Sequence, residues 1–422
     1  MQENAYLRAK MTILLTRKQK EKHMKETKPR LVERRYLWTF ILITSLFALW
    51  GFANDITNPM VAAFQTVMEI SNAKASMIQF AFYGGYATMA IPAAAWQNFW
   101  FFCGSLYILT FGLAFLETTA NPFILSLGDK ATSTRRLNLS QAFNPMGSLS
   151  GMAVASFVVL PQLLSDKRDA AGQVIFPLLS ETEKADIRLH DLAVIRDPYV
   201  AIGLVVLVVA IIIALTKMPQ TAGEGVSSPA KETLRRLWHN HVYREGVVAQ
   251  VFYVAAQIMT WTFIIQYADN LGINKAVAQT YNIVAMSLFL CSRFICTFLM
   301  RYVNTRTLLA VFGVGAGLCT AGAICIVGMP GLYCLIGVSF FMSLMFPTIY
   351  GIALENVDSR DTSLGAAFLV MAIVGGALMP PLQGHIIDLG TIFGHPAVNV
   401  SFVLPLICFC IITIYGLRSR TR

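Results

Sequence analysis

Charged residues are scarce in this sequence. Asp, Glu, Lys and Arg make up 13% of the 422 residues, whereas hydrophobic residues make up 56% and the mean hydropathy is +0.59. Soluble globular proteins carry about 25% charged residues, so this chain has too few polar groups to cover a soluble surface. The composition excludes a soluble enzyme, a disordered chain and a nucleic-acid-binding domain. It predicts an all-α integral membrane protein that lies mostly in the lipid bilayer.

Sequence patterns for metal, cofactor or nucleotide chemistry are missing as well. The eight cysteines all lie in apolar stretches, and none is spaced from a histidine as zinc ligands are, so we expect neither disulfides nor a metal site. The chain has no P-loop, no H-E-x-x-H motif, no G-x-S-x-G motif and no ATP-binding cassette. We therefore expect no enzyme activity, no cofactor and no nucleotide as the energy source.

Positive charge is concentrated at the start of the chain. The net charge is +10, and residues 1–35 carry 11 Lys or Arg against four Asp or Glu. A basic segment before a membrane span is typical of a cytoplasmic tail near anionic lipid headgroups. Because no folded basic domain follows, nucleic acid is not an expected partner.

Eleven apolar stretches are long enough to cross a membrane, which takes about 20 residues. They cover 36–65, two spans within 75–127 that break near Pro92, 137–162, 198–216, 246–268, 276–299, two spans within 307–354 that break at Met329-Pro330-Gly331, 362–387 and 397–417. Polar segments at 163–197 and 217–244 interrupt them. The resulting prediction is a basic cytoplasmic tail (1–35), an N-terminal bundle of five spans (36–217), a cytoplasmic linker (218–243), a C-terminal bundle of six spans (244–417) and a basic cytoplasmic tail (418–422).

The basic loops of the first bundle are not all placed on one side of the membrane if that bundle has five spans. Short basic segments face the cytoplasm, so an even number of spans should separate any two of them. The linker, the Arg301–Arg306 loop and the C-terminal tail obey this rule. Only three spans separate the basic N-terminal tail from the loop with Lys130, Arg135 and Arg136. Either one helix is absent before residue 128 or one basic segment faces the wrong side.

Four motifs are distributed along most of the chain: Leu116-Glu117-Thr118-Thr119-Ala120-Asn121-Pro122-Phe123, Arg136-Leu137-Asn138-Leu139-Ser140-Gln141-Ala142-Phe143-Asn144, Phe346-Pro347-Thr348-Ile349 and Phe368-Leu369-Val370-Met371. They resemble motifs of bacterial L-fucose:proton symporters, the fucose permease branch of the major facilitator superfamily. The resemblance implies two six-helix bundles that transport L-fucose together with protons across the cell inner membrane by alternating access.

The sequence departs from this family in two places. Ile91-Pro92-Ala93-Ala94-Ala95-Trp96 resembles the end of family helix 2 fused to the segment before helix 4, so helix 3 is predicted to be missing and the twelve family helices become about eleven. On helix 1 the family has Asn and then Asp three residues later, whereas this chain has Asp55 and then Asn58. The carboxylate is thus shifted by one turn on the same helix face.

Two carboxylates are candidates for proton coupling. A carboxylate near mid-membrane costs roughly 2.5–3.5 kcal/mol on insertion scales, and it is kept where it faces a water-filled cavity or takes up a proton. Asp55 and Glu117 are the interior carboxylates of the first bundle. The resemblance favours Glu117 as the group that couples proton and sugar binding, with Asp55 as a second titrating or sugar-contacting group. The alternative is that each neutralises a buried cation.

Polar and aromatic residues at helical spacing are candidates for sugar binding. Glu117 and Asn121 share a helix face, as do Gln141 and Asn144, and Tyr253, Gln257 and Trp261 continue one stripe. The predicted substrate-binding set is Asn58, Asn121, Gln141, Asn144, Tyr253, Gln257 and Trp261. The alternative for each amide is a hydrogen bond between neighbouring helices. Arg293, in the span 276–299, is interpreted as an end-of-helix side chain that snorkels to the membrane surface near Arg301.

Two alternative functions remain open. The same family branch includes glucose/galactose and amino-sugar carriers, and Glu117 favours fucose without deciding the sugar. The chain could instead be a transport-defective deletion product, because a missing helix leaves the short Pro92–Asn98 connection to compensate for a whole membrane crossing.

Overall fold

The structure, a computed structural model, describes residues 30–67, 116–165, 167, 175–216, 230–273, 275–392 and 394–420. These residues are almost all helical, apart from one short antiparallel pair of strands. The elements are η1 (Arg34–Tyr36), α2 (Leu37–Val67), η2 (Lys130–Thr132), α6 (Ser133–Val154), η3 (Ala155–Val159), η4 (Leu160–Gln162), η5 (Phe176–Leu178), α7 (Glu181–Leu215), α8 (Ala230–His239), α9 (His241–Asn270), α10 (Lys275–Leu299), α11 (Thr305–Cys325), α12 (Met329–Met342), α13 (Met345–Leu354), α14 (Thr362–Met371), η6 (Ala372–Val374), α15 (Gly375–Ile387), β1 (Thr391–Ile392), β2 (His395–Pro396), α16 (Ala397–Ser401) and α17 (Val403–Arg420). Residues 116–126 form a further helical segment.

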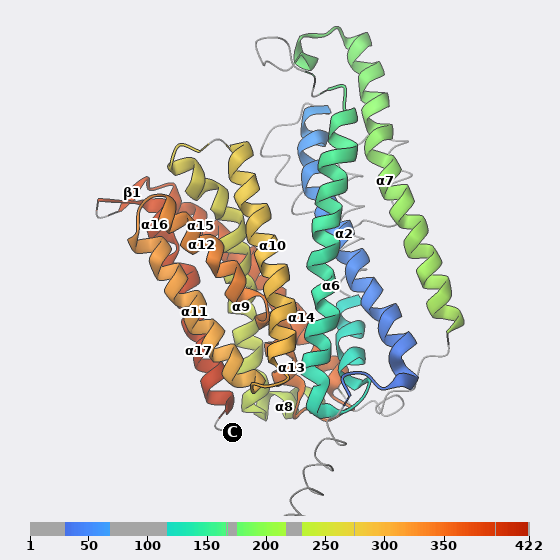
Figure 1. Cartoon of the computed structure of the whole chain (residues 1–422), viewed down its shortest axis with the longest axis vertical. Coiled ribbons are helices and arrows are strands. Elements are labelled where there is room, and N and C mark those ends of the chain that lie inside the picture. Colours follow the sequence, from blue (N-terminus) through green and yellow to red (C-terminus); the bar gives the residue numbers. More distant parts are fainter. Residues whose placement is uncertain are drawn as a thin grey trace, which may run out of the picture.

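The helices form two groups that lie side by side (Figure 1). Helices α2, α6 and α7 make one group, with the helical segment 116–126, and helices α9 to α17 make the other. The short amphipathic helix α8 lies at the end of the molecule where α9 begins and α17 ends, which we call the linker side. An all-helical membrane architecture is thus what the apolar runs predicted.

Nine helical stretches in the described part of the chain are long and apolar enough to cross a membrane. The predicted break at Met329-Pro330-Gly331 is confirmed, because α11 ends at Cys325 and α12 begins at Met329. The spans predicted within 75–127 lie mostly outside the described residues, so nine described spans are consistent with the eleven predicted.

Helix α7 includes half of the polar segment 163–197, for which no secondary structure was predicted from the sequence. It begins at Glu181 and continues without a break through Pro198 to Leu215, so half of the predicted polar segment is helical. Its start is fixed by a capping box between Ser180 and Glu183. At 35 residues the helix is about 52 Å long, well beyond the roughly 30 Å hydrocarbon core. Its polar first half therefore projects past the membrane.

Helices α2 and α6 cross at very short range because each has a glycine at the contact. A Cβ atom on Gly51 would lie 1.9 Å from the carbonyl oxygen of Asn144, and one on Gly147 would lie 1.9 Å from that of Ala48. No larger residue fits at either position, as is typical of small-residue contacts between membrane helices. The crossing fixes Asn144 against α2, where its Nδ2 donates to the Phe47 carbonyl at 3.4 Å.

The two groups of helices contact each other toward the linker side. Arg135 Nε on α6 donates to the Thr297 carbonyl on α10 at 3.0 Å, and Asn138 Nδ2 donates to Thr348 Oγ1 on α13 at 3.2 Å. A shared apolar core continues across the contact, with Phe47 of α2 and Tyr350 of α13 among its fully buried members. The groups are therefore packed together at the end that carries the basic loops.

Arg136 ties the start of α6 to the end of the helical segment 116–126. The side chain is fully buried, and it donates to the carbonyl oxygens of Ile124 and Leu125 at 2.8 and 2.6 Å and to that of Leu31 at 3.0 Å. Cations near the last carbonyls of a helix stabilise its C-terminus. Arg136 therefore holds in place the helix that carries Glu117.

Contacts near the Lys130–Arg136 loop exclude one of the two explanations for the odd number of spans, namely that a basic segment faces the wrong side. Arg136 reaches Leu31, and Thr132 Oγ1 donates to the Arg30 carbonyl at 3.4 Å, so the Lys130–Arg136 loop lies on the same side as the start of α2. No basic segment in the described residues faces the wrong side here. An even number of crossings is therefore needed between α2 and the segment 116–126. The sequence of 68–115 offers only one complete apolar span, before Pro92, so one crossing lacks a helix.

A buried carboxylate attaches α8 to the start of α14. Asp361 is 2% exposed, and it accepts hydrogen bonds from Arg236 Nε and Nη2, both at 2.7 Å, and from Thr233 Oγ1 at 2.8 Å. The hydrogen bonds from Arg236 hold the pKa of this carboxyl below its usual value. The folded-state pKa lies below the unfolded one, so the pair stabilises the fold fully above about pH 4 and less as the pH falls through the folded value.

Asp361→Asn should therefore lower the stability of the folded protein by about 1–3 kcal/mol at pH 7, because Arg236 loses a charged, bidentate partner. The difference from wild type should shrink as the pH falls below about 4, which thermal unfolding in detergent would measure. Asp358→Asn is the matched control, because Asp358 is 46% exposed and pairs with Arg360 at the surface, where ion pairs are worth about 0–1 kcal/mol. Equal effects of the two variants would contradict this account of the Arg236–Asp361 pair.

Candidate functional site

Three of the predicted site residues come together within the first group of helices. Glu117 and Asn121 lie one turn apart on the helical segment 116–126, and both are buried. Gln141 on α6 donates from its Nε2 to Asn121 Oδ1 at 2.8 Å. None of the ion pairs among the described residues includes Glu117. Within that part of the chain, Glu117 does not neutralise a cation.

Several buried polar atoms of the segment 116–126, α9 and α13 have no hydrogen-bond partner among the described residues. They include Asn121 Nδ2, Gln250 Nε2 and Oε1, Tyr253 Oη and Tyr350 Oη. Tyr350 on α13 belongs to the same apolar cluster as Leu116 and Ala120, the neighbours of Glu117 on the segment 116–126. Buried polar groups are normally satisfied, so a concentration of unsatisfied donors and acceptors is what a site for a polyhydroxylated ligand requires.

Aromatic side chains from the second group of helices lie on the other side of the candidate site. The rings of Tyr253 and Phe346 are 6.1 Å apart, and Phe346 stacks on Tyr350 at 6.4 Å. Trp261 donates from its indole Nε1 to Ser339 Oγ at 3.2 Å and contacts the Phe289 ring edge-on at 5.1 Å. Such rings offer flat apolar surfaces to the C–H face of a sugar. Gln257 is partly buried on the same helix as Tyr253 and Trp261.

Arg293 does not snorkel, and that prediction is wrong. The side chain is 4% exposed, and its guanidinium lies over the Phe289 ring at 4.7 Å. Its Nε donates to the Ser343 carbonyl at 2.6 Å, and its Nη1 donates across to the Gln141 carbonyl of α6 at 3.0 Å. The sequence could not reveal this, because backbone carbonyls from two distant segments satisfy the guanidinium.

Arg293 joins the two halves of the candidate site. It contacts Phe289, which packs on Trp261, and it binds the backbone of Gln141, whose side chain binds Asn121. A continuous series of contacts thus runs from the aromatic residues of the second group to the helix of Glu117. Any rearrangement that separates α6 from α10 on the linker side must break the bond between Arg293 and Gln141.

Arg293→Met should weaken the closure of the linker side, because the bond from the buried cation to Gln141 is lost; hydrogen bonds of charged groups are worth about 1.5–3 kcal/mol. Spin labels on the exposed positions Lys130 and Ser359, in a cysteine-free background, would report the distance between the two groups of helices by double electron–electron resonance spectroscopy. We expect a longer distance in Arg293→Met and the wild-type distance in Arg301→Met, an exposed arginine near the end of the same helix. An unchanged distance in Arg293→Met would contradict this role.

Three predicted residues are not joined to this cluster in the described structure. Asn144 lies on α6 but donates to the Phe47 carbonyl of α2, where it contributes to helix packing. Asp55 and Asn58 lie on α2, and their side chains are outside the described part of the structure.

Sequence reasoning missed Tyr350 and Arg293 as parts of the site. Tyr350 follows the Phe346-Pro347 motif by one helical turn, so its spacing from Phe346 placed both on one face. For Arg293 the signal was its position in the middle of an apolar span, which was interpreted as the end of a helix.

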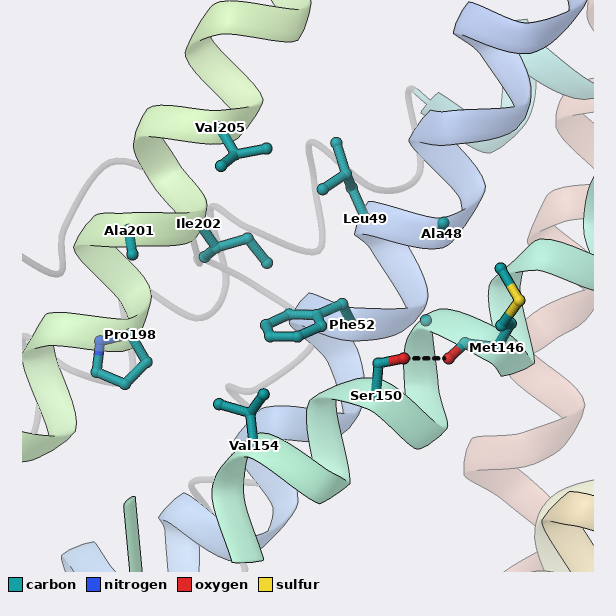
Figure 2. A pocket seen from close by; sticks show the side chains of 11 residues that line it. Ala48, Leu49, Phe52, Met146, Ser150, Val154, Pro198, Ala201, Ile202 and Val205 are labelled. Atoms are coloured by element: carbon teal, nitrogen blue, oxygen red, sulfur yellow. Dashed lines mark hydrogen bonds between the residues drawn. The ribbon is translucent and has the colours of Figure 1, made fainter. Parts of the chain in front are cut away.

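An apolar groove lies apart from the candidate site, between α2, α6 and α7 (Figure 2). It has a volume of about 410 Å³ and is lined by Ala48, Leu49, Phe52, Met146, Gly147, Ser150, Val154, Pro198, Ala201, Ile202 and Val205. The Ser150 hydroxyl donates to the Met146 carbonyl of its own helix at 2.9 Å, so its hydrogen is already used within α6. The groove contains none of the candidate residues, and its lining does not suit a sugar.

Comparisons with known proteins agree with this architecture. A family model described as Major Facilitator Superfamily matches residues 80–380. The chain is 58% identical to an L-fucose-proton symporter of Haemophilus influenzae over 92% of this chain and 98% of the relative, and 26% identical to a glucose/galactose transporter of Brucella abortus over 91% and 95%. A crystal structure of a transporter of that superfamily, FucP, in the outward conformation matches with a TM-score of 0.83 and 29% identity over 92% of this chain and 99% of the other.

The alignment with the Haemophilus influenzae relative leaves part of that relative without a counterpart in this chain. It has 421 positions but uses 92% of this 422-residue chain, which is about 388 residues. About 33 positions therefore have a residue in the relative and none here. That number is enough for one membrane helix with its loop.

Proposed function

The chain belongs to the Major Facilitator Superfamily, and we propose that it is an L-fucose–proton symporter. It is a multi-pass membrane protein and a secondary transporter, not an enzyme. The observations that carry the proposal are the buried cluster of Glu117, Asn121 and Gln141 and the unsatisfied buried polar groups on α9 and α13, together with 58% identity to a symporter of that name.

In this mechanism Glu117 takes up the proton and the amides bind the sugar. Protonation removes the charge from a buried carboxylate that has no cationic partner among the described residues, so a loaded site can reorient at lower cost than an unprotonated one. Asn121, Gln141 and Tyr253 would bind hydroxyl groups, and Trp261 would stack on the apolar face of the sugar. Asp55, Asn58 and Gln257 complete the proposed site. Asn144, whose Nδ2 is bonded to the Phe47 carbonyl, would contribute only its side-chain oxygen.

Alternating access requires the two groups of helices to separate at one end at a time. The contacts of Arg135, Asn138 and Arg293 keep the linker side closed. The site therefore opens toward the opposite side of the membrane, in keeping with the likeness to an outward conformation. The basic segments place the linker side in the cytoplasm. The opposite side of the inner membrane is therefore the side from which L-fucose and protons would enter.

A glucose/galactose carrier is the second candidate, supported by the 26% identity to the Brucella abortus protein. The higher identity to an L-fucose-proton symporter favours L-fucose. L-fucose is 6-deoxy-L-galactose, so its C6 is a methyl group where D-glucose and D-galactose carry a hydroxymethyl group. A site built for L-fucose can therefore place an aromatic ring beside that methyl group. Tyr253 and Trp261 are the two rings of the described site that the sequence predicted as sugar contacts.

Uptake of labelled sugars by cells that express the chain tests the proposal. We expect saturable L-fucose uptake that exceeds uptake of D-galactose and D-glucose and that a protonophore abolishes. Uptake that persists unchanged without a proton gradient would exclude symport, and preference for D-glucose or D-galactose would favour the second candidate.

A further inference from the structure

Helix α8 has one face that is fixed to the protein. Thr233 and Leu237 are buried, and Arg236 is held by the bidentate pair with Asp361. Helix α8 packs on the first turns of α9 and α14. Its orientation on the linker side is thus set by contacts that need no further partner.

The opposite face of α8 combines two cations with two large apolar side chains. Lys231, Leu234, Arg235 and Trp238 recur at intervals of three, one and three residues, which places them on one side of the helix. All four are exposed, Leu234 by 45% and Trp238 by 63%. A tryptophan and a leucine exposed between cations are unusual on a surface that faces only water.

This outer face continues into the surface of α9 that faces the acyl chains. The Arg244 guanidinium lies 5.8 Å from the centre of the Trp238 ring. Val248 follows Arg244 by one turn on the same membrane-spanning helix, and it is 46% exposed. An apolar side chain exposed one turn inside a span contacts acyl chains, so Trp238 and Arg244 lie at the depth of the headgroups.

We propose that Lys231, Leu234, Arg235 and Trp238, together with Arg244, bind the headgroups of anionic phospholipids in the linker-side leaflet. The charges are complementary: three cations face the headgroup layer, while the neighbouring Glu232 is turned to Arg236, with 3.8 Å between its carboxylate and Nη1. Leu234 and Trp238 enter the boundary between headgroups and acyl chains, as the apolar side chains of interfacial amphipathic helices do.

The apolar pair selects a lipid over other anions. Free phosphate or an acidic peptide would gain from the cations alone and would leave Leu234 and Trp238 in water. A phospholipid satisfies both kinds of group at once. Because Arg236 links the other face of α8 to Asp361, bound lipid also stabilises the position of the start of α14. This inference concerns the surface of the protein and does not depend on which sugar is transported.

Native mass spectrometry of the purified chain in detergent, titrated with phosphatidylglycerol or phosphatidylcholine, tests the proposal. We expect phosphatidylglycerol to bind more tightly. One basic residue near an anionic surface is worth roughly a fivefold change in affinity, so Lys231→Ala combined with Arg235→Ala should weaken phosphatidylglycerol binding about 25-fold. The charge-keeping pair Lys231→Arg and Arg235→Lys should retain it.

Three controls make the outcome decisive. Arg196→Ala removes a cation from the middle of α7, outside α8 and α9, and should leave phosphatidylglycerol binding unchanged. Trp238→Ser should weaken binding of the lipid without changing net charge. The thermal unfolding midpoint of each variant shows that it is folded. Equal affinity for the two lipids, an equal loss in Arg196→Ala, or full competition by inorganic phosphate would overturn the proposal.

Discussion

Glu117→Gln is expected to abolish net accumulation of L-fucose while exchange of labelled for unlabelled sugar continues. Glutamine keeps the shape and hydrogen-bonding capacity of the side chain but cannot release a proton. Exchange needs only the loaded site to reorient, whereas accumulation needs the proton to leave on the other side. We therefore expect uptake against a gradient to fall to background, a loss of tenfold or more, with exchange retained.

Glu355→Gln is the matched control for this change. Glu355 lies at the surface of the linker side, where its carboxylate pairs with Arg306 at 2.7 Å. The control should accumulate sugar as the wild type does. Full accumulation by Glu117→Gln would show that another group carries the proton, and Asp55→Asn would then be the next variant to measure.

Restoring a third helix is expected to raise the rate of transport. The described contacts place both the start of α2 and the Lys130–Arg136 loop on the linker side, so the chain between them must cross the membrane an even number of times. Without the additional helix, Pro92–Asn98 has to make a crossing. Seven extended residues span at most about 25 Å, less than the roughly 30 Å core, and each unpaired backbone group there costs several kcal/mol.

The insertion experiment compares three proteins. One is the chain as it is, one carries a family helix 3 with its basic loop between Ala93 and Ala94, and one carries a Gly/Ser segment of equal length. We expect initial L-fucose uptake to rise at least tenfold with the helix and not with the Gly/Ser segment. Equal uptake by the first two proteins would show that the chain crosses the membrane without that helix.

The helices of this fold were largely predictable because membrane spans are long runs without charge. Helices α9 and α10, and the break between α11 and α12, follow directly from such runs. The first half of α7 was missed because its residues are polar, although Ser180 and Glu183 carry the spacing of a capping box. A helix that leaves the membrane has no apolar run to reveal it.

The candidate site was predictable along each helix but not between helices. The four-residue spacing of Glu117 and Asn121 predicted that they share a face, since it depends only on helix geometry. The bond from Gln141 to Asn121 and the bond from Arg293 to the Gln141 carbonyl depend on how α6 and α10 approach each other. Spacing within one helix carries no information on that approach, which is why Arg293 was assigned to the membrane surface.

Calorimetric titration of the purified protein with L-fucose at pH 8, in two buffers of different ionisation enthalpy, tests the central claim most directly. The difference between the buffers gives the number of protons taken up with each bound sugar. If Glu117 couples sugar to proton, the wild type takes up protons as L-fucose binds, while Glu117→Gln binds L-fucose without proton uptake. The absence of L-fucose binding by the wild type, or equal proton uptake by both proteins, would contradict the claim.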